Sequence, residues 1–169
     1  MKQIDELQDC LDGVSGTLVV SPAPSAAWTV VIKKALAHLG REKRYWVYAT
    51  LPFDAGALAQ PADGDDWLYD LCWLSLSDGR LLVDMELAMQ AAWGQTDEVL
   101  GAFQKLCQAR ARFKLMVYHA QTEDACDQLT ALLTRQRAVF ARRDPTETWL
   151  LSCWVAELRG FRHRAVEAE

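Results

Sequence analysis

A carboxylate stands inside one of the most apolar stretches of the chain. Asp70 lies within residues 68–73, which read Leu-Tyr-Asp-Leu-Cys-Trp. Acidic side chains are seldom buried among apolar ones without a partner, and carboxylate oxygens are the ligands that hard cations such as Mg²⁺ prefer. We therefore expect Asp70 to be a present or former metal ligand. The alternative is an ordinary acid at an exposed edge.

A second set of polar side chains follows after a short turn. Residues 81–90 carry Asp84, Glu86 and Gln90 at even spacing. Because side chains alternate between the faces of a strand, these three are expected to share one face. Glu86 then reaches a metal held by Asp70 if the strands are aligned accordingly. The alternative is that Asp84 and Glu86 face solvent near the turn.

Other reactive residue types are scattered through the chain. Lys105 belongs to an amphipathic segment, so its helical pattern by itself predicts a surface lysine whose stem lies along apolar surface. His119 ends an apolar run and is a conceivable acid or base, although a structural role is the simpler interpretation. The five cysteines include no Cys-x-x-Cys pair, which argues against a disulfide framework and a zinc site and favours a reducing cytoplasm.

Apolar periodicity predicts the elements that position these side chains. We expect helices over 3–12, 28–40, 97–110 and 122–142, and a brief strand or extended entry over 18–20. Further strands are expected over 45–48, 67–76, 81–90, 113–119 and 148–155, the last with a helix as alternative. The expected end signals are Ser25 and Thr96 as N-caps and Gly40 as a helix stop. Residues 52–66 are expected to form a loop, and the tail from 159 to 169 is expected to fray. We predict one α/β domain over 1–169, with a central mixed β-sheet flanked by helices.

The order helix, strand, hairpin, helix, strand, helix resembles the core of the PD-(D/E)xK nuclease superfamily, the restriction-endonuclease-like fold. The resemblance covers about residues 25–120 of a core that we place at about 25–155. Residues 28–40 are similar to the first helix of the family. The segment Tyr69-Asp70-Leu71-Cys72-Trp73 resembles its apolar-Asp-Leu-x-Trp strand. The segments Met89-Gln90-Ala91-Ala92-Trp93-Gly94 and Phe103-Gln104-Lys105-Leu106 resemble a strand ending in an acidic pair and a helix with a migrated lysine.

The resemblance implies a catalytic set of Asp70, Gln90 and Lys105. In such enzymes two carboxylates hold Mg²⁺, the metal lowers the pKa of a bound water, and the lysine orients or activates the nucleophile. Asp70 would be the first ligand and Gln90 would take the place of the second carboxylate, with Glu86 as a further metal ligand. The family usually has Glu at the position of Gln90 and often a charged residue at that of Ala92. Because an amide carries no negative charge, Mg²⁺ affinity should fall.

Charge is distributed unevenly along the chain. Residues 1–100 carry 7 basic and 15 acidic side chains, and residues 101–169 carry 11 basic and 8 acidic ones. The net charge of −5 disfavours a protein that simply coats nucleic acid. Residues 105–143 still offer a basic face for a nucleic-acid partner, with a solvated surface as the alternative. No run of the sequence approaches membrane-spanning length, so we expect no membrane segment.

Two functions from different classes fit these observations. The first is a metal-dependent phosphodiester hydrolase with a weakened site. Asp70, Lys105 and the basic face favour this function. The second is a domain that has kept the fold, lost catalysis and binds a partner protein. Gln90, Ala92, the acidic N-terminal half and the seven tryptophans favour the second. An unrelated α/β domain that binds a small molecule also fits the composition, but no motif supports it.

Overall fold

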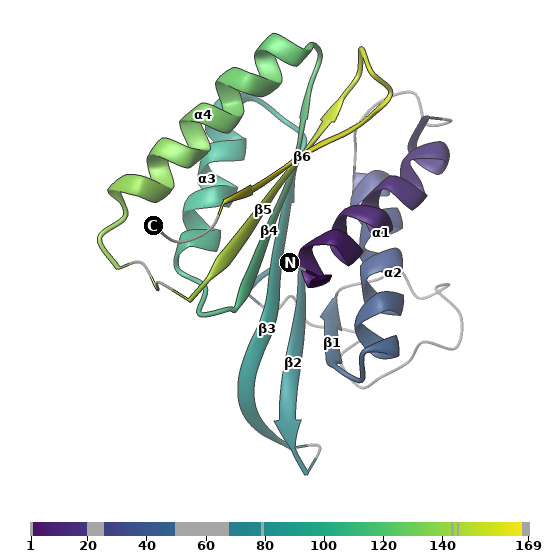
Figure 1. The fold of residues 1–169 in the computed structure, drawn as a ribbon, viewed down its shortest axis with the longest axis vertical. Helices are drawn as coiled ribbons and strands as arrows, with labels where there is room; N and C mark the ends of the chain where they lie inside the picture. Colours follow the sequence, from purple (N-terminus) through teal and green to yellow (C-terminus); the bar gives the residue numbers. More distant parts are fainter. Residues whose placement is uncertain are drawn as a thin grey trace.

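The computed structural model describes residues 2–19, 26–49, 68–78, 80–142, 144 and 146–166. The predicted loop over 52–66 and the predicted cap Ser25 lie outside these residues. In the described part, six strands form one mixed sheet with helices on both of its faces (Figure 1). The predicted α/β class with a central mixed sheet is confirmed.

The elements follow one another along the chain in an order close to the predicted one. The described helices are α1 (Lys2–Val19), α2 (Ala26–Glu42), α3 (Thr96–Cys107) and α4 (Glu123–Val139). The described strands are β1 (Trp46–Ala49), β2 (Leu71–Ser77), β3 (Leu81–Ala92), β4 (Phe113–Ala120), β5 (Thr148–Val155) and β6 (Gly160–Val166).

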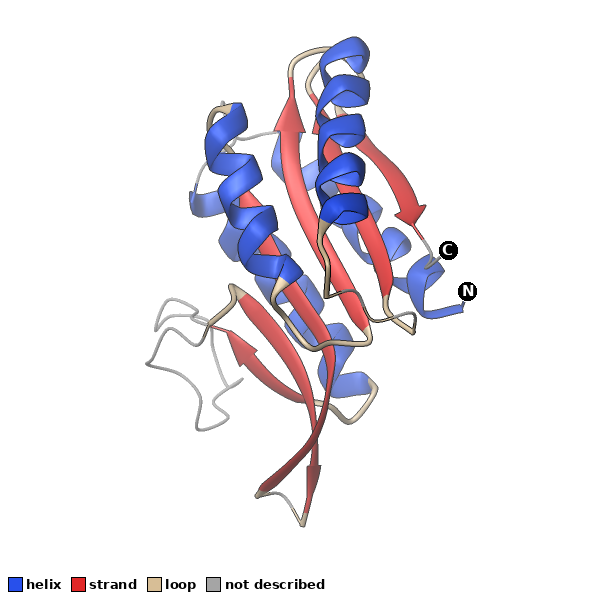
Figure 2. Cartoon of the chain, turned by 90° about the vertical axis from the view of Figure 1, so that its left-hand side faces the viewer, coloured by secondary structure: helices blue, strands red, loops and turns tan. Residues whose placement is uncertain are grey.

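Neighbouring strands in the sheet are also neighbours in the sequence. The order is β1-β2-β3-β4-β5-β6, with parallel pairing of β3 with β4 and of β4 with β5, and antiparallel pairing elsewhere. Parallel neighbours need a crossover connection, which α3 and α4 supply. Figure 2 shows these two helices side by side in front of the sheet, and α1 and α2 cover the opposite face.

The sheet divides the core into two apolar layers. On β4, Leu115 and Val117 pack with α1 and α2, whereas Met116 and Tyr118 pack with α3 and α4. All four side chains are at most 1% exposed. Strands covered on both faces read as continuous apolar runs, which is why the central strands were visible in the sequence.

Gly40 has a different role from the predicted one. Helix α2 continues past it to Glu42, so Gly40 is not the stop. A Cβ atom at this position would overlap the indole ring of Trp73. The Trp73 Nε1 donates a hydrogen bond to the carbonyl oxygen of Leu36, at 3.1 Å. Gly40 therefore allows β2 to approach α2 closely.

Three further local predictions were wrong. The strand or extended entry predicted over 18–20 is replaced by helix at its described residues, because Leu18 continues the helical spacing of Leu7 and Leu11 and is buried as part of α1. Residue 20 lies outside the described residues. Thr96 is the first residue of α3 and not its cap; the N-cap is Gln95. The tail does not fray over 160–166, where β6 pairs with β5 along its length. β5 is buried on both faces, so a strand beside it satisfies its outer hydrogen-bonding edge.

Candidate functional site

The structure places Asp70 and Gln90 beside each other. Asp70 directly precedes β2, and its carboxylate Oδ2 accepts a hydrogen bond from the backbone N–H of Ala91 at 2.8 Å. Leu71 is the register partner of Met89, so the next pair toward the end of β3 is Asp70 with Gln90. One carboxylate oxygen thus accepts the hydrogen bond of the Ala91 backbone N–H on the β2 side of β3, beyond the last residue pair with β2, while β4 pairs with the other side.

Gln90 is almost completely buried. Its side chain is 5% exposed and lies on the α3 side of the sheet, between Ala88 and Ala92 along the strand. Its Nε2 donates to the carbonyl oxygen of Met89 at 3.4 Å, which is a long contact within the same strand. A neutral side chain is tolerated in this apolar layer, whereas a carboxylate would need a charged partner.

Glu86 does not share the face of Gln90, which corrects the predicted alternation. Two consecutive residues of β2 are the register partners of Leu87 and Met85, so Glu86 is an extra residue in a β-bulge. Met85 consequently packs on the α3 and α4 side of the sheet, and the alternation changes at Glu86. The sequence pattern assumed an unbroken strand and therefore placed Glu86 too close to Asp70.

The partners of Glu86 lie near the hairpin and not at the predicted metal site. Its Oε1 accepts a hydrogen bond from the Ser75 hydroxyl at 3.4 Å, and its Oε2 lies 3.6 Å from Arg112. Its charge contributes to a raised pKa of Tyr45, for which burial is the larger cause. Arg112 also lies 3.9 Å from Asp84, so the two acids of β3, Asp84 and Glu86, share one guanidinium group.

Lys105 lies on the same side of the sheet as Asp70 but is exposed on the surface. Its Nζ is 5.9 Å from the centroid of the Tyr69 ring. Burial raises the pKa of the Cys72 thiol to about 12, with the Asp70 charge adding to the rise and the Lys105 charge opposing it. Both charges are therefore near Cys72. Asp70 and Lys105, both described residues, do not form an ion pair with each other.

These residues are a poor donor set for Mg²⁺. They supply one carboxylate, already engaged by a backbone N–H, and one neutral amide. Within the part of the chain that the structure describes, no group of three or more His, Cys, Asp or Glu side chains is placed to hold a metal ion. Magnesium prefers several oxygen ligands that include carboxylates, so this arrangement does not fit the group that the family resemblance implies.

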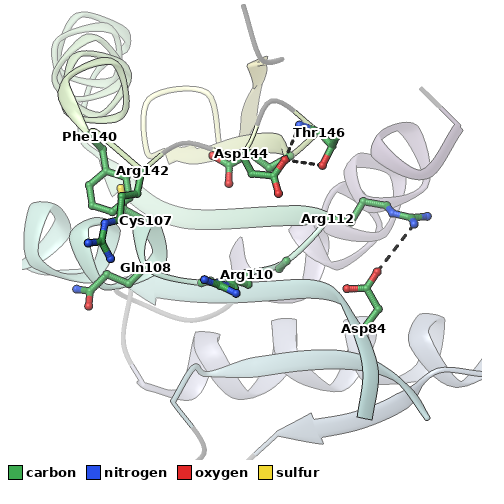
Figure 3. A pocket seen from close by; sticks show the side chains of 12 residues that line it. Asp84, Cys107, Gln108, Arg110, Arg112, Phe140, Arg142, Asp144 and Thr146 are labelled. Carbon is green, nitrogen blue, oxygen red and sulfur yellow. Dashed lines mark hydrogen bonds and ion pairs between the residues drawn. The ribbon is translucent and has the colours of Figure 1, made fainter. Parts of the chain in front are cut away.

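A groove lies at the other end of the parallel strands. It has a volume of about 1010 Å³ and is lined by residues 107–112, by residues between 140 and 147, and by Asp84 of the hairpin (Figure 3). The guanidinium groups of Arg110 and Arg142 are exposed there and have no ion-pair partner in the described residues. Sequence reasoning missed this groove because two crossover connections and a hairpin, far apart in the chain, come together to form it.

The floor of the groove contains a buried ion pair. Lys114 and Glu147 are 2% and 6% exposed, and their Nζ and Oε2 atoms are 2.5 Å apart. The indole Nε1 of Trp149 donates to the other Glu147 oxygen at 2.8 Å, and the ammonium group lies 4.8 Å from the indole centroid. Each charge is thus partnered, as burial requires. The signal in the sequence was a lysine inside the apolar run 113–118.

The basic face predicted for residues 105–143 is smaller than its composition suggests. Lys114 and Arg137 are buried, and Arg112 is paired with the two hairpin acids. Arg143 lies outside the described residues. The exposed arginines that remain in this region are Arg110, Arg135 and Arg142.

A serine, a histidine and an aspartate form a chain of contacts that the sequence did not reveal. Ser152 Oγ is 2.9 Å from His163 Nδ1, and His163 Nε2 is 3.2 Å from Asp12 Oδ1. Ser152 is 0% exposed, so its hydroxyl is out of reach of a substrate. The contacts tie α1 to β6 and β5, which is a structural role. His119 has no described hydrogen-bond partner, and burial lowers its pKa.

Comparisons of the chain with protein-family models, with curated proteins and with solved structures find no match. No helix in the described ranges combines the length and the apolar character needed to cross a membrane.

Proposed function

We propose that this chain is a nuclease-like α/β domain whose metal site has degenerated and which acts by binding a partner, not by hydrolysis. The order α2-β1-β2-β3-α3-β4, with an antiparallel hairpin followed by a parallel crossover, supports the resemblance to PD-(D/E)xK proteins. Fold and function are separable, so the choice between hydrolysis and binding depends on the site.

The main support for the proposal is the surroundings of the Asp70 carboxylate. It accepts a hydrogen bond from the Ala91 N–H, and the side chain next to it is the buried, uncharged Gln90. Glu86, the other candidate ligand, is displaced by the bulge and holds Arg112. With a single carboxylate, the site lacks the charge that retains Mg²⁺ and stabilises a pentavalent phosphate transition state.

Calorimetric titration of Mg²⁺ and Mn²⁺ tests this proposal. The wild-type protein is expected to bind neither ion detectably at millimolar concentration. Gln90→Glu adds a charge beside Asp70 and is expected to create measurable binding. Gln104→Glu, on the exposed side of α3, introduces the same charge away from the site and is the matched control.

Two results would contradict the proposal. Metal-dependent cleavage of single- or double-stranded substrates by the wild type, lost in Asp70→Ala or Lys105→Ala, would show a working nuclease. Equal metal affinity of Gln90→Glu and Gln104→Glu would show that Gln90 does not occupy a ligand position.

A further inference from the structure

The β2–β3 hairpin extends beyond the rest of the sheet. Figures 1 and 2 show it as a two-stranded ribbon projecting from one end of the molecule. β1 pairs with β2 only as far as Leu74, and β4 pairs with β3 only from Leu87 onward. On the side of β3 that faces β4, one more backbone hydrogen bond follows, from the N–H of Arg112 to the carbonyl oxygen of Met85. Beyond it, the edge of β3 over residues 81–84 has no partner strand among the described residues.

This free edge carries three consecutive exposed aliphatic side chains. Leu81, Leu82 and Val83 are 69%, 56% and 66% exposed. Proteins normally protect free edges with charges, prolines or very short strands, because an apolar edge pairs readily with other chains. A run of exposed aliphatic residues on such an edge is therefore typical of an interaction surface.

The same edge borders the groove that contains the unpaired arginines. Asp84, the next residue of β3, lines the groove and lies 3.9 Å from Arg112. In Figure 3, Arg110 lies between this pair and Arg142. Of the other two acids of the groove, Glu147 is paired with Lys114, and Oδ1 of the exposed Asp144 accepts two hydrogen bonds from Thr146. The cations of the groove that have no ion-pair partner among the described residues are thus the two guanidinium groups of Arg110 and Arg142, which favour carboxylates.

We propose that an extended segment of a partner protein, with alternating apolar and acidic residues, binds as an additional strand along residues 81–84. Its backbone would pair with the free edge, its apolar side chains would cover Leu82 and Val83, and its acidic side chains would reach Arg110 and Arg142. This inference names the partner class of the proposed binding function and rests on it. The aliphatic character of the edge favours a peptide over single-stranded nucleic acid, which is usually bound on aromatic side chains.

Fluorescence anisotropy with two designed peptides tests the inference. The probe is a labelled peptide of about six residues, the usual length of a strand, with alternating valine and glutamate. A peptide of alternating valine and lysine is the charge control. The first is expected to bind the full chain and the second is not. Residues 81–84 are expected to exchange their amide hydrogens more slowly when the first peptide is bound.

Variants of exposed residues assign the contacts. Arg110→Glu and Arg142→Glu are each expected to weaken binding of the valine–glutamate peptide about tenfold, the effect of losing one charge-assisted hydrogen bond. Arg135→Glu makes the same charge change on α4, away from the groove, and should bind like wild type. Leu82→Ser removes the apolar contact without adding a charge and should weaken binding without altering the circular dichroism spectrum.

Other outcomes would overturn the inference. Equal binding of both peptides, or loss of binding in Arg135→Glu as large as in Arg142→Glu, would indicate nonspecific attraction. If neither peptide binds at millimolar concentration, residues 81–84 are not a peptide-binding edge. Preferential binding of a single-stranded oligonucleotide would indicate nucleic acid, and self-association abolished by Leu82→Ser would indicate a second copy. The metal titration is independent of all these results. If neither peptide binds, the proposal that the chain has lost hydrolysis is therefore unaffected.

Discussion

Asp70 holds the end of β3 on its β2 side, where the pairing with β2 stops at Met89 while the pairing with β4 continues to Ala92. Its carboxylate provides the acceptor that the Ala91 N–H would otherwise lack within the sheet. Asp70→Ala is expected to lower the free energy of unfolding by about 1–2 kcal/mol, because a hydrogen bond to a charged acceptor is lost. Asp70→Asn keeps an acceptor oxygen and should lose less. Urea unfolding measures both, and an Ala variant as stable as wild type would contradict this role.

His119 predicts a pH dependence of stability. Burial lowers its pKa in the folded state below the ordinary value of 6.5, so the unfolded chain takes up the proton first as the pH falls. The contribution is therefore complete above about pH 6.5 and is lost progressively below it. In thermal unfolding between pH 5 and 8, the melting temperature of His119→Asn should fall less toward acid pH than that of the wild type. Identical slopes would exclude His119 as the cause.

The contact between α2 and β2 depends on the absence of a side chain at Gly40. A methyl group there would displace the Trp73 indole and its hydrogen bond to Leu36. Gly40→Ala is expected to destabilise the protein by about 2 kcal/mol or more, although alanine favours helix by about 1 kcal/mol.

Gly101 provides the matched control for this prediction. It lies in α3, and a Cβ atom built there meets nothing within 4 Å. Gly101→Ala should stabilise the protein by about 0.5–1 kcal/mol through helix propensity alone. Opposite signs for the two variants in guanidinium unfolding are the expected result. Stabilisation by both would show that Trp73 adapts.

The bulge at Glu86 shows what element prediction from sequence misses. The apolar run in the sequence correctly located β3, because its second half is buried on both faces of the sheet. The extra residue depends on the pairing with β2 and leaves no mark in the local pattern. The sequence could therefore predict that a strand carries Glu86 and Gln90 but not that their side chains point to opposite faces.

At the scale of the whole molecule, the class of fold and most elements were predictable from the sequence. The parallel strands are long apolar runs, and amphipathic helices separate them. The closeness of Asp70 and Gln90 could be predicted because the two residues lie on adjoining strands of the predicted hairpin. The groove and the contacts of Ser152, His163 and Asp12 did not, because they depend on segments up to 151 residues apart. The tail was misjudged because its polar composition hides an edge strand.

The packing of α1 on β6 sets an order of events during synthesis. Helix α1 ends at Val19, and the strand to which Asp12 is joined begins only at Gly160. At synthesis rates of roughly 5–20 residues per second, α1 leaves the ribosome roughly 7 to 30 s before β6 does. During that interval its apolar face, with Leu7 and Leu11, lacks the last-made part of its binding surface. The apolar face of α1 is thus expected to remain partly exposed on the nascent chain until β6 emerges.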